Sequence, residues 1–473
     1  MPASVVIVGG GPAGLSAALE VSRKGGRPLV LEKLTEMGGL ARTVVYQGHR
    51  FDIGPHRFFT LNEEVKALFR DVGGADIVRV RRLTRILYRN RFFRYPLTPV
   101  NALFGVGLLA GLGIFSSYAG ARLRRKLSPR PILTFEDWVV DRFGRRLFTM
   151  FFKTYTEKVW GIPCERIDAE WAGQRIKGLS LGRAVLIALG FSRSAVVKTL
   201  VDEFLYPRLG AGQLYEKMAA LVEAAGGRVL RRTEATRINR QGYRVCGIAY
   251  CGADGSSVTA SGDFYLSSAP LTELLAQFDP PPPDDVQRAA KGLAYRNHIS
   301  VQLLAKGEIP FPDNWIYLHS PEVKMARVCS YRNFSAAMAA NPDTHPLTAE
   351  YFCFADEWLW MASDAELIDL ARREIASMKL LAGATIIDAF VVRSPRAYPV
   401  IEVGYADKVA TIKTWLDRFE NFLPIGRSGM FKYNNQDHAM ATGLLAARTA
   451  LGLGHFDPWM VNIDGAYQEG GKA

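Results

Sequence analysis

A glycine-rich turn near the start of the chain constrains the fold more than any other feature. Residues 4–8 read SVVIV, and Gly9, Gly11 and Gly14 follow in GxGxxG spacing, with a helical pattern over residues 12–19. In such a turn the first glycine permits the tight bend, the second lets the backbone approach a pyrophosphate, and the third lets helix and strand pack closely. The segment predicts a dinucleotide site in a parallel α/β sheet. A glycine-rich turn in another α/β fold is the alternative.

An acidic residue at the end of the next strand supports the dinucleotide site. Residues 28–31 form a second apolar run, and Glu32 lies 18 residues beyond the last glycine of the turn. This is close to the position at which a carboxylate binds ribose hydroxyls. The helix that begins at Pro12 and Ala13 would direct its positive N-terminal end toward phosphates. With Lys33, these residues are our first candidates for cofactor binding.

Two motifs that follow resemble the FAD amine-oxidase superfamily. Residues 38–42 (GGLAR) are similar to its second glycine-arginine motif, in which the arginine contacts the pyrophosphate, and residues 51–56 resemble its Gly-Pro segment beside the flavin. The resemblance implies FAD as the cofactor, and no second GxGxxG in a strand-helix setting indicates a nicotinamide domain. It assigns to the cofactor Gly38, Gly39, Leu40, Ala41, Arg42, Gly54, Pro55 and His56.

The C-terminal part extends the resemblance. Residues 423–427 read as a short strand ending in glycine, and a helix of small residues is expected as far as Ala450. In the superfamily the N-terminus of the corresponding helix faces the isoalloxazine, whereas the alternative is a closing helix with no ligand. A helix-strand unit in the middle of the chain is similar to the one that touches the adenine. The resemblance thereby adds Thr236, Ala269, Gly426, Arg427, Asn435, Gln436 and Met440 to the cofactor residues.

The pieces of the expected flavin domain are separated along the chain. We expect an α/β fold with a Rossmann-type FAD-binding domain built from residues 1–90, 205–270 and 385–473. A mixed α+β substrate domain is inserted discontinuously, with a helical substrate- or membrane-facing part at 91–204 and a β-rich part at 271–384. A chain of 473 residues is long enough for both domains.

Most of the net charge of +13 lies in one segment. No acidic residue occurs between Asp76 and Glu136, and this stretch holds twelve Arg or Lys on either side of the uncharged segment Tyr95–Ala121. Three interpretations stay open: a buried helix pair that lines a substrate cavity, peripheral docking on an anionic membrane, and a membrane span. No nucleic-acid motif accompanies the arginines, so we do not expect nucleic acid as a partner.

Composition also sets the expected compartment and ligands. The five cysteines are scattered without disulfide or metal-ligand spacing, so we expect no metal site and a reducing compartment. We therefore expect a cytoplasmic protein, held at the inner face of the membrane if the basic segment docks there. The expected partner is a small-molecule substrate, anionic or lipid-like if the arginines bind it. The oligomeric state stays open.

Two branches of the superfamily compete. The flavin motifs resemble those of amine oxidases and protoporphyrinogen oxidases, while residues 155–161 (YTEKVWG) resemble a mutase motif whose tyrosine and tryptophan help form the nucleotide pocket. That motif belongs to the UDP-galactopyranose mutases. Two arginines that grip the diphosphate in the mutases have no counterpart in this sequence. The resemblance assigns to the substrate Tyr155, Trp160, Arg175, Arg427 and Tyr433.

Three functions follow from these resemblances. The first is an FAD-dependent oxidoreductase that transfers a hydride from a C–N or C–C bond to flavin N5, with catalytic candidates His56, Arg57, Tyr433 and Asn435. His56 would be a proton shuttle near neutral pH or a hydrogen-bonded structural histidine. The second function is a redox-neutral mutase that uses reduced flavin as a nucleophile. The third is a non-catalytic flavin-binding protein.

Overall fold

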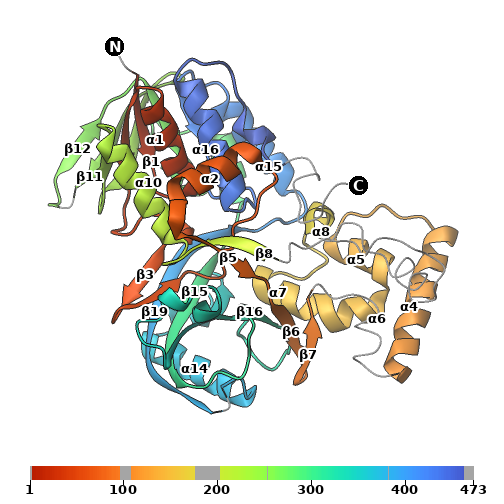
Figure 1. The fold of residues 1–473 in the computed structure, drawn as a ribbon. Helices are drawn as coiled ribbons and strands as arrows, with labels where there is room; N and C mark the ends of the chain where they lie inside the picture. The colour runs from red at the N-terminus through yellow and green to blue at the C-terminus, as the bar shows by residue number, and fades with distance from the viewer. Residues whose placement is uncertain (1–2, 96–107, 176–202, 253, 382, 463–473) are drawn as a thin grey trace.

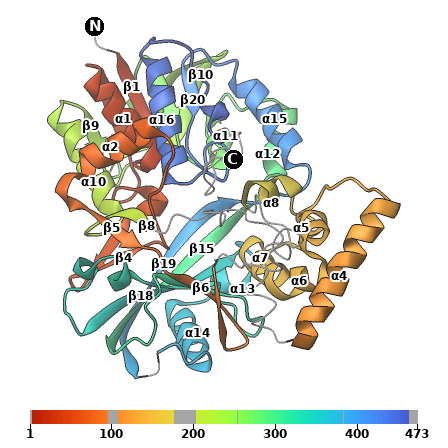
Figure 2. The same ribbon diagram turned by 45° about the vertical axis from the view of Figure 1, so that its right-hand side comes forward.

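The computed structural model describes residues 3–95, 108–175, 203–252, 254–381 and 383–462. They form a parallel sheet with its helices, a larger mixed sheet, and a helical lobe that extends to one side (Figure 1). Seen from a second direction, the helical lobe lies beside both sheet layers (Figure 2).

The five-stranded parallel sheet carries the glycine-rich turn. Its strand order is β20-β13-β1-β2-β9, and every neighbouring pair is parallel, which confirms the predicted α/β sheet. The strands are β20 (Phe422–Pro424), β13 (Phe264–Ser267), β1 (Ser4–Val8), β2 (Arg27–Leu31) and β9 (Arg228–Leu230). The central strand β1 is therefore flanked by strands from distant parts of the chain.

Alternate residues of β1 enter two different cores, as the two-residue period of a strand requires. Val5 and Ile7 pack among the helices, whereas Val6 and Val8 face the core shared with a four-stranded sheet. On the helical face lie α1 (Pro12–Arg23), α2 (Glu63–Gly73), α10 (Gly212–Ala224) and α16 (Gln436–Ala450). The sheet on the other face has β12 (Ser257–Ala260), β11 (Arg244–Cys251), β10 (Glu234–Gln241) and β14 (Phe278–Asp279).

The seven-stranded sheet forms the base of the second layer. Its order is β19-β15-β18-β17-β16-β6-β7, antiparallel except for the parallel pair β16–β6. The strands are β19 (Ala384–Pro399), β15 (Tyr295–Gly307), β18 (Thr344–Cys353), β17 (Arg327–Ser330), β16 (Trp315–Leu318), β6 (Thr84–Tyr88) and β7 (Arg91–Arg94). The expected boundaries at 90 and 385 put β6 and β19 with the flavin domain, but both pair in this sheet. Periodicity identifies a strand without saying which sheet it joins.

Shorter elements connect the two layers. Two-stranded ribbons and helices fill the junction and the outer faces, and α14 packs on the seven-stranded sheet. These elements are β3 (Thr43–Tyr46), β4 (His49–Asp52), β5 (Ile77–Arg81), β8 (Glu203–Pro207), α11 (Leu271–Ala276), α12 (Asp284–Lys291), α13 (Trp358–Met361), α14 (Asp364–Ser377) and α15 (Tyr405–Leu416).

The helical lobe supplies one wall of the site. It contains α4 (Leu108–Leu127), α5 (Phe135–Phe143), α6 (Arg145–Leu147), a π-helical turn (Phe148–Lys153), α7 (Thr154–Trp160) and α8 (Ala169–Arg175). Thr134 caps α5 by accepting the Asp137 N–H over 3.1 Å. Gly161 ends α7 in the left-handed region, with φ +70°.

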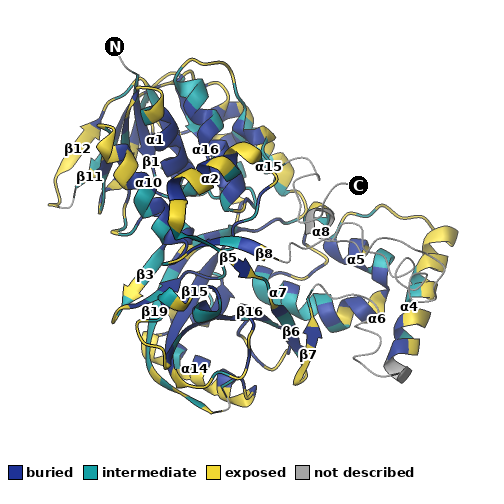
Figure 3. Cartoon of the chain, in the orientation of Figure 1, coloured by how far each residue is buried: buried dark blue, intermediate teal, exposed yellow. Residues whose placement is uncertain are grey.

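Of the uncharged segment, residues 96–107 lie outside the described part, and residues 108–121 belong to the single helix α4, where Leu112 and Phe115 are exposed (Figure 3). The described residues therefore do not form a buried helix pair. No described residue of α4 lines the main cavity. Among the helices that the structure describes, none is both long enough and apolar enough to cross a bilayer.

Candidate functional site

One cavity of about 620 Å³ runs from the first turn of α1 to the helical lobe. The carboxyl ends of the parallel strands supply one end of its wall, the usual ligand position in an open α/β sheet. The seven-stranded sheet, α7 and the π-helical turn supply the other end. Segments from both ends of the chain therefore meet around one space.

Most of the residues predicted from sequence line this cavity. They are Gly9, Gly11, Pro12, Ala13, Glu32, Lys33, Gly39, Leu40, Ala41, Arg42, Gly54, Pro55, His56, Arg57, Tyr155, Trp160, Ala269, Gly426, Arg427, Tyr433, Asn435 and Gln436. Gly14, in the first turn of α1, and Gly38, in the turn before Gly39, lie just behind the lining.

The three glycines of the first turn differ in what requires them. A Cβ on Gly14 would come within 1.9 Å of the Gly9 carbonyl oxygen, so packing inside the protein excludes any side chain there. A Cβ on Gly11 would meet no described atom closer than 3.8 Å, and Gly11 has an ordinary extended φ of −82°. No described residue therefore excludes a side chain at position 11. A ligand lying directly against the Gly11 backbone would exclude one, and a pyrophosphate is such a ligand.

Glu32 and Arg42 are polar groups buried beside this turn. The Glu32 carboxylate accepts the Gly10 N–H over 2.7 Å and the Leu34 N–H over 2.8 Å, which fixes its orientation and leaves lone pairs for ribose hydroxyls. Arg42 donates to the Gly39 carbonyl over 2.8 Å. Burial lowers the pKa of Arg42, while Glu36 and Glu32 oppose the shift. A buried guanidinium without a close carboxylate partner among the described residues suits an anionic cofactor.

Helix α16 begins at the same cavity. The backbone N–H of Asn435 donates to Nδ1 of His438 over 3.2 Å, and the Asn434 side chain donates to the Gly426 carbonyl over 3.2 Å. A Cβ on Gly443 would come within 2.1 Å of the Ala13 carbonyl oxygen, so this glycine allows α16 to lie directly on α1. The N-termini of two packed helices thus face one cavity, an arrangement that favours negative charge.

His56 is enclosed next to the buried carboxylate of Glu350. Gly54, at φ +98°, brings the chain so close that a Cβ there would lie 2.9 Å from Glu350 Oε2. Burial lowers the pKa of His56 to about 3, although Glu350 opposes the shift. This shift favours the neutral imidazole near neutral pH and does not support a proton shuttle that titrates in that range. Its Nδ1 is buried and has no hydrogen-bond partner among the described residues.

A network that the sequence reasoning missed lies under the middle of the cavity. Nη2 of Arg327 donates to Oε2 of Glu350 over 2.5 Å, and Nε2 of His298 lies 2.9 Å from the same oxygen. Burial alone would raise the pKa of Glu350, but the charge of Arg327 and the hydrogen bond from His298 lower it to about 2. Arg327 lines the cavity, and its Nε has no partner in the part of the chain that the structure describes.

The guanidinium of Arg427 lies against two adjoining tyrosine rings, whose centroids are 5.7 Å apart. Its guanidinium carbon lies 4.2 Å from the ring centroids of both Tyr398 and Tyr433. Nε and Nη2 of Arg427 are buried and find no hydrogen-bond partner in the described part of the chain. Unsatisfied donors on a buried cation are costly unless a ligand or solvent accepts them. This end of the cavity therefore presents two arginines, Arg327 and Arg427, with buried N–H groups that no described residue accepts.

Aromatic side chains form the wall beyond these arginines. Tyr155 stacks on His319 with ring centroids 4.7 Å apart and planes 10° apart. Trp160 contacts both Trp171 and Tyr433, at centroid distances of 5.2 and 5.8 Å. The indole nitrogens of Trp160 and Trp171 are buried, and no described residue accepts a hydrogen bond from them. The wall can hold a flat or apolar body and still donate hydrogen bonds to it.

Besides Gly14 and Gly38, three predicted residues are not among the described residues that line the cavity. Thr236 is exposed and its hydroxyl donates to the Ala249 carbonyl over 3.2 Å, because the β10–β11 register shifts between Ala235 and Arg237. Ala235 and its neighbours Thr233 and Glu234 line the cavity instead. Met440 is buried in the helical core, about 100° around α16 from the lining residue Ala439. Arg175 ends α8, and its side chain lies outside the described residues.

Comparisons with known proteins agree on the kind of site. The sequence profile of the flavin-containing amine oxidoreductases matches residues 12–400. A protein of Mycobacterium tuberculosis provisionally named flavin-containing monoamine oxidase AofH is 27% identical over 307 residues, which are 60% of this chain. The match spans 61% of that relative, so the chain covers about three fifths of its length.

Solved structures show the same fold over almost the whole chain. A reduced UDP-galactopyranose mutase superposes with a TM-score of 0.82 at 20% identity, covering 96% of this chain and 95% of the mutase. A protein from Exiguobacterium provisionally assigned as a protoporphyrinogen oxidase gives a TM-score of 0.70 at 16% identity, covering 96% and 98%. At such identities the likeness is one of fold.

Proposed function

Because the chain belongs to the family of flavin-containing amine oxidoreductases and its cofactor is FAD, we propose that it is an oxidoreductase for an anionic small molecule. The proposed reaction removes a hydride from a C–N or C–C bond of that molecule. When bound, FAD supplies the two-electron acceptor.

The observation that carries the proposal is the state of Arg427. A guanidinium packed against Tyr398 and Tyr433, with Nε and Nη2 buried and unpartnered among the described residues, is preorganised for a carboxylate or phosphate. Arg327 offers its Nε, equally without a described partner, at the same wall. Glu350 compensates the charge of Arg327, so Arg427 supplies the positive charge that no described carboxylate balances at this wall, and a simple amine cation is disfavoured there.

The remaining lining residues have positioning roles in this proposal. Glu350 holds Arg327 in place, and the stacked Tyr155–His319 pair packs against the body of the substrate. Exclusion of water by the aromatic wall would strengthen the arginine–anion contacts. His56, neutral near pH 7, could accept or donate a hydrogen bond without carrying charge.

A second candidate function is the redox-neutral isomerisation of a sugar nucleotide. Arg327, supplied by β17, gives the cavity a second cation that the sequence motifs had not indicated. Together with Tyr398 and Tyr433 it could bind a diphosphate, which supports the mutase-like alternative. The structural similarity to the mutase is one of fold and does not favour this candidate over oxidation.

Anaerobic mixing of the purified holoprotein with charge-matched substrate pairs tests the proposal. N-benzylglycine and its methyl ester have the same oxidisable C–N bond, but only the acid carries the carboxylate. We expect the acid to bleach the oxidised flavin band faster than the ester. Arg427→Lys should reduce this preference by about ten- to a hundredfold, since a point charge replaces a planar fork. Equal rates for acid and ester would contradict an anionic substrate.

A second measurement separates the two candidate functions. Protein reduced with dithionite is exposed to air, and the return of the flavin band is followed. Reoxidation within seconds supports an oxidase, whereas reoxidation over many minutes indicates a dehydrogenase or a mutase. Binding of a UDP-sugar to the reduced form alone, with no bleaching by any member of the substrate panel, would favour the mutase.

A further inference from the structure

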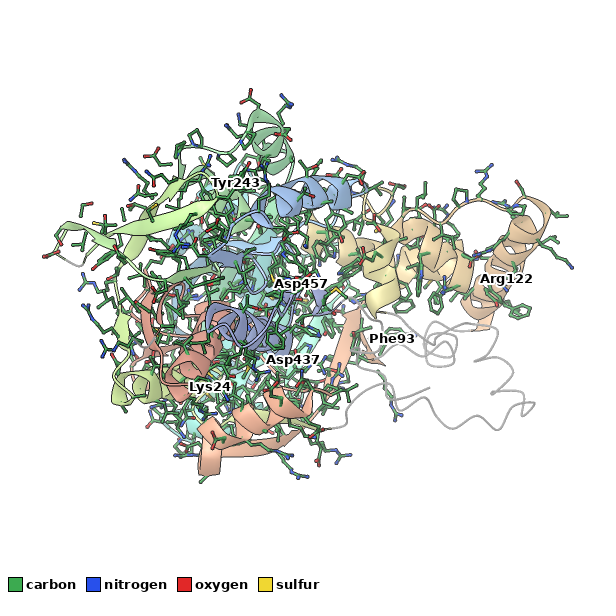
Figure 4. The ribbon with its side chains drawn as sticks, turned by 90° about the horizontal axis from the view of Figure 1, so that it is seen from above. Lys24, Phe93, Arg122, Tyr243, Asp437 and Asp457 are labelled. Carbon is green, nitrogen blue, oxygen red and sulfur yellow. The ribbon has the colours of Figure 1, made fainter. Side chains whose placement is uncertain are left out.

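Helix α4 (Leu108–Leu127) lies at the outer end of the helical lobe, remote from both sheets (Figure 1, Figure 2). It packs on α5 and α6 through one side, where Ile114 is fully buried. Figure 4 shows Arg122 on this helix at the far end of the molecule from Lys24. The other side of α4 has no described element against it and is coloured as exposed in Figure 3.

That outer side is apolar. The exposed fractions are 64% for Leu112, 48% for Phe115, 58% for Leu123 and 75% for Leu127. At 100° per residue these positions, with exposed Ala119, fall within an arc of about 120° opposite Ile114, and the same arc also holds Ser116 and Lys126. Water-exposed helices normally place polar residues there. The stripe is therefore a formed apolar face that the described part of the chain leaves uncovered.

Five cations lie on or just beyond the C-terminal part of α4, and three of them have no carboxylate partner among the described residues. Arg122 and Arg125 both lie within ion-pair distance of Asp141, on the side facing α5. Arg124, Lys126 and Arg130 are exposed and form no ion pair with any described residue. No acidic residue occurs from position 77 to position 135 to offset them. The face thus combines an apolar stripe with three exposed cations, Arg124, Lys126 and Arg130, which we call the positive rim.

We propose that α4 docks the protein on the surface of an anionic phospholipid membrane, lying parallel to it. Leu112, Phe115, Leu123 and Leu127 enter the boundary between headgroups and acyl chains, and Arg124, Lys126 and Arg130 contact lipid phosphates. Apolar insertion plus attraction to anionic headgroups is how interfacial helices bind. The positive rim is the reason for choosing this occupant, because a second copy of the chain would bring another positive rim against it.

Vesicle flotation of the full-length holoprotein tests the proposal. We expect it to float with vesicles of phosphatidylglycerol and phosphatidylcholine in equal parts and not with pure phosphatidylcholine. High salt should release it, because screening weakens the headgroup attraction. Flotation on both vesicle types alike, or on neither, would overturn the proposal.

Two variants locate the contact on α4. Leu123→Glu should lower partitioning by about tenfold, and Lys126→Glu by about fivefold or more. The matched controls are Leu221→Glu, at an exposed leucine of α10, and Arg228→Glu, at an exposed arginine of β9. Both controls should bind as the unaltered protein does. An effect as large in the controls as on α4 would overturn the assignment to this helix.

Two further readouts distinguish membrane docking from misfolding and from self-association. Flavin absorbance and circular dichroism should be unchanged in all four variants, since each altered side chain is exposed. If one variant fails to fold, the salt dependence of the unaltered protein and the remaining α4 variant still decide the outcome. Light scattering reports self-association: a dimer that Leu123→Glu dissociates would show that a second copy covers the stripe and would overturn the proposal.

Discussion

Arg327 and Glu350 stand directly opposite each other on β17 and β18, and their side chains meet in a 2.5 Å ion pair. His298, from the next strand β15, donates from Nε2 to the same carboxylate oxygen over 2.9 Å. Gly54 of the flavin side passes just above that oxygen. This carboxylate is therefore the point at which the seven-stranded sheet, the cavity wall and the Gly-Pro segment are held together.

Glu350→Gln should destabilise the protein by about 3 kcal/mol, because it leaves the buried charge of Arg327 uncompensated. The free energy of unfolding in urea measures the loss. Asp369→Asn is the matched control: it breaks the exposed pair between Arg373 and Asp369, which should cost less than about 1 kcal/mol. Equal effects of the two substitutions would show that the buried carboxylate is not needed to balance Arg327.

Gly11→Ala and Gly14→Ala should fail in different ways. The Gly11 substitution has room within the protein, so the fold and the unfolding temperature of the apoprotein should be retained while FAD is lost. The Gly14 substitution drives a Cβ into the Gly9 carbonyl and should lower both stability and FAD content. Flavin absorbance per protein and thermal unfolding measure the two effects. Retention of FAD by the Gly11 variant would contradict our placement of the pyrophosphate.

Gly443→Ala should separate α16 from α1. Its Cβ would lie 2.1 Å from the Ala13 carbonyl oxygen, so we expect a loss of about 1–3 kcal/mol and weaker FAD binding, since both helices begin at the cavity. Gly120→Ala is the control, because a Cβ there meets nothing within 4 Å. That substitution should raise stability by up to about 1 kcal/mol through helix propensity. Urea unfolding and FAD titration compare them.

The stability of the protein should fall as the pH is lowered from 7 to 5, partly because of His319. Burial, helped by the charge of Lys158, lowers the pKa of His319 to about 3, below its ordinary value of 6.5. The unfolded chain therefore gains a proton at mild acidity that the folded chain does not. At pH 5 this linkage corresponds to about 2 kcal/mol. Burial lowers the pKa of Lys158 to about 8, which lies above the range from pH 7 to pH 5, so Lys158 stays largely protonated over that range.

His319→Phe keeps the stacking on Tyr155 and removes the titration. We expect the difference in unfolding free energy between pH 7 and pH 5 to shrink by about 2 kcal/mol in this variant. His455→Phe, at an exposed histidine, should leave that difference unchanged. A slope in the His319 variant as steep as in the unaltered protein would mean that His319 is not held neutral.

The cofactor end of the site was predictable because its signals are local. Gly11 and Glu32 lie within one strand-turn-helix-strand unit, where spacing along the chain fixes position in space. The substrate end depends on register between strands. His298, Arg327 and Glu350 meet only because β15, β18 and β17 are neighbours, and they are separated by 52 and 23 residues. A lone charge within an otherwise apolar strand, as at Glu350, was the one available signal.

Errors within predicted elements have equally specific causes. Thr236 was assigned to the adenine wall, but a bulge in β10 turns its side chain outward. Met440 lies on the predicted helix, but its side chain points into the helical core, whereas the neighbouring residue Ala439 lines the cavity. Strand pairing irregularities and helix phase are set by tertiary packing, so neither can be derived from spacing alone.

The central position of β1 has a consequence for the synthesis of the protein. Gly426 and Asn435 are synthesised some 400 residues after Gly11 and Glu32. At ordinary translation rates this corresponds to a delay of about 20 to 80 s. Until β13, β20 and α16 arrive, Val5, Ile7 and Val30 have no completed core to enter. FAD can therefore be enclosed on all sides only after these distant segments have been synthesised.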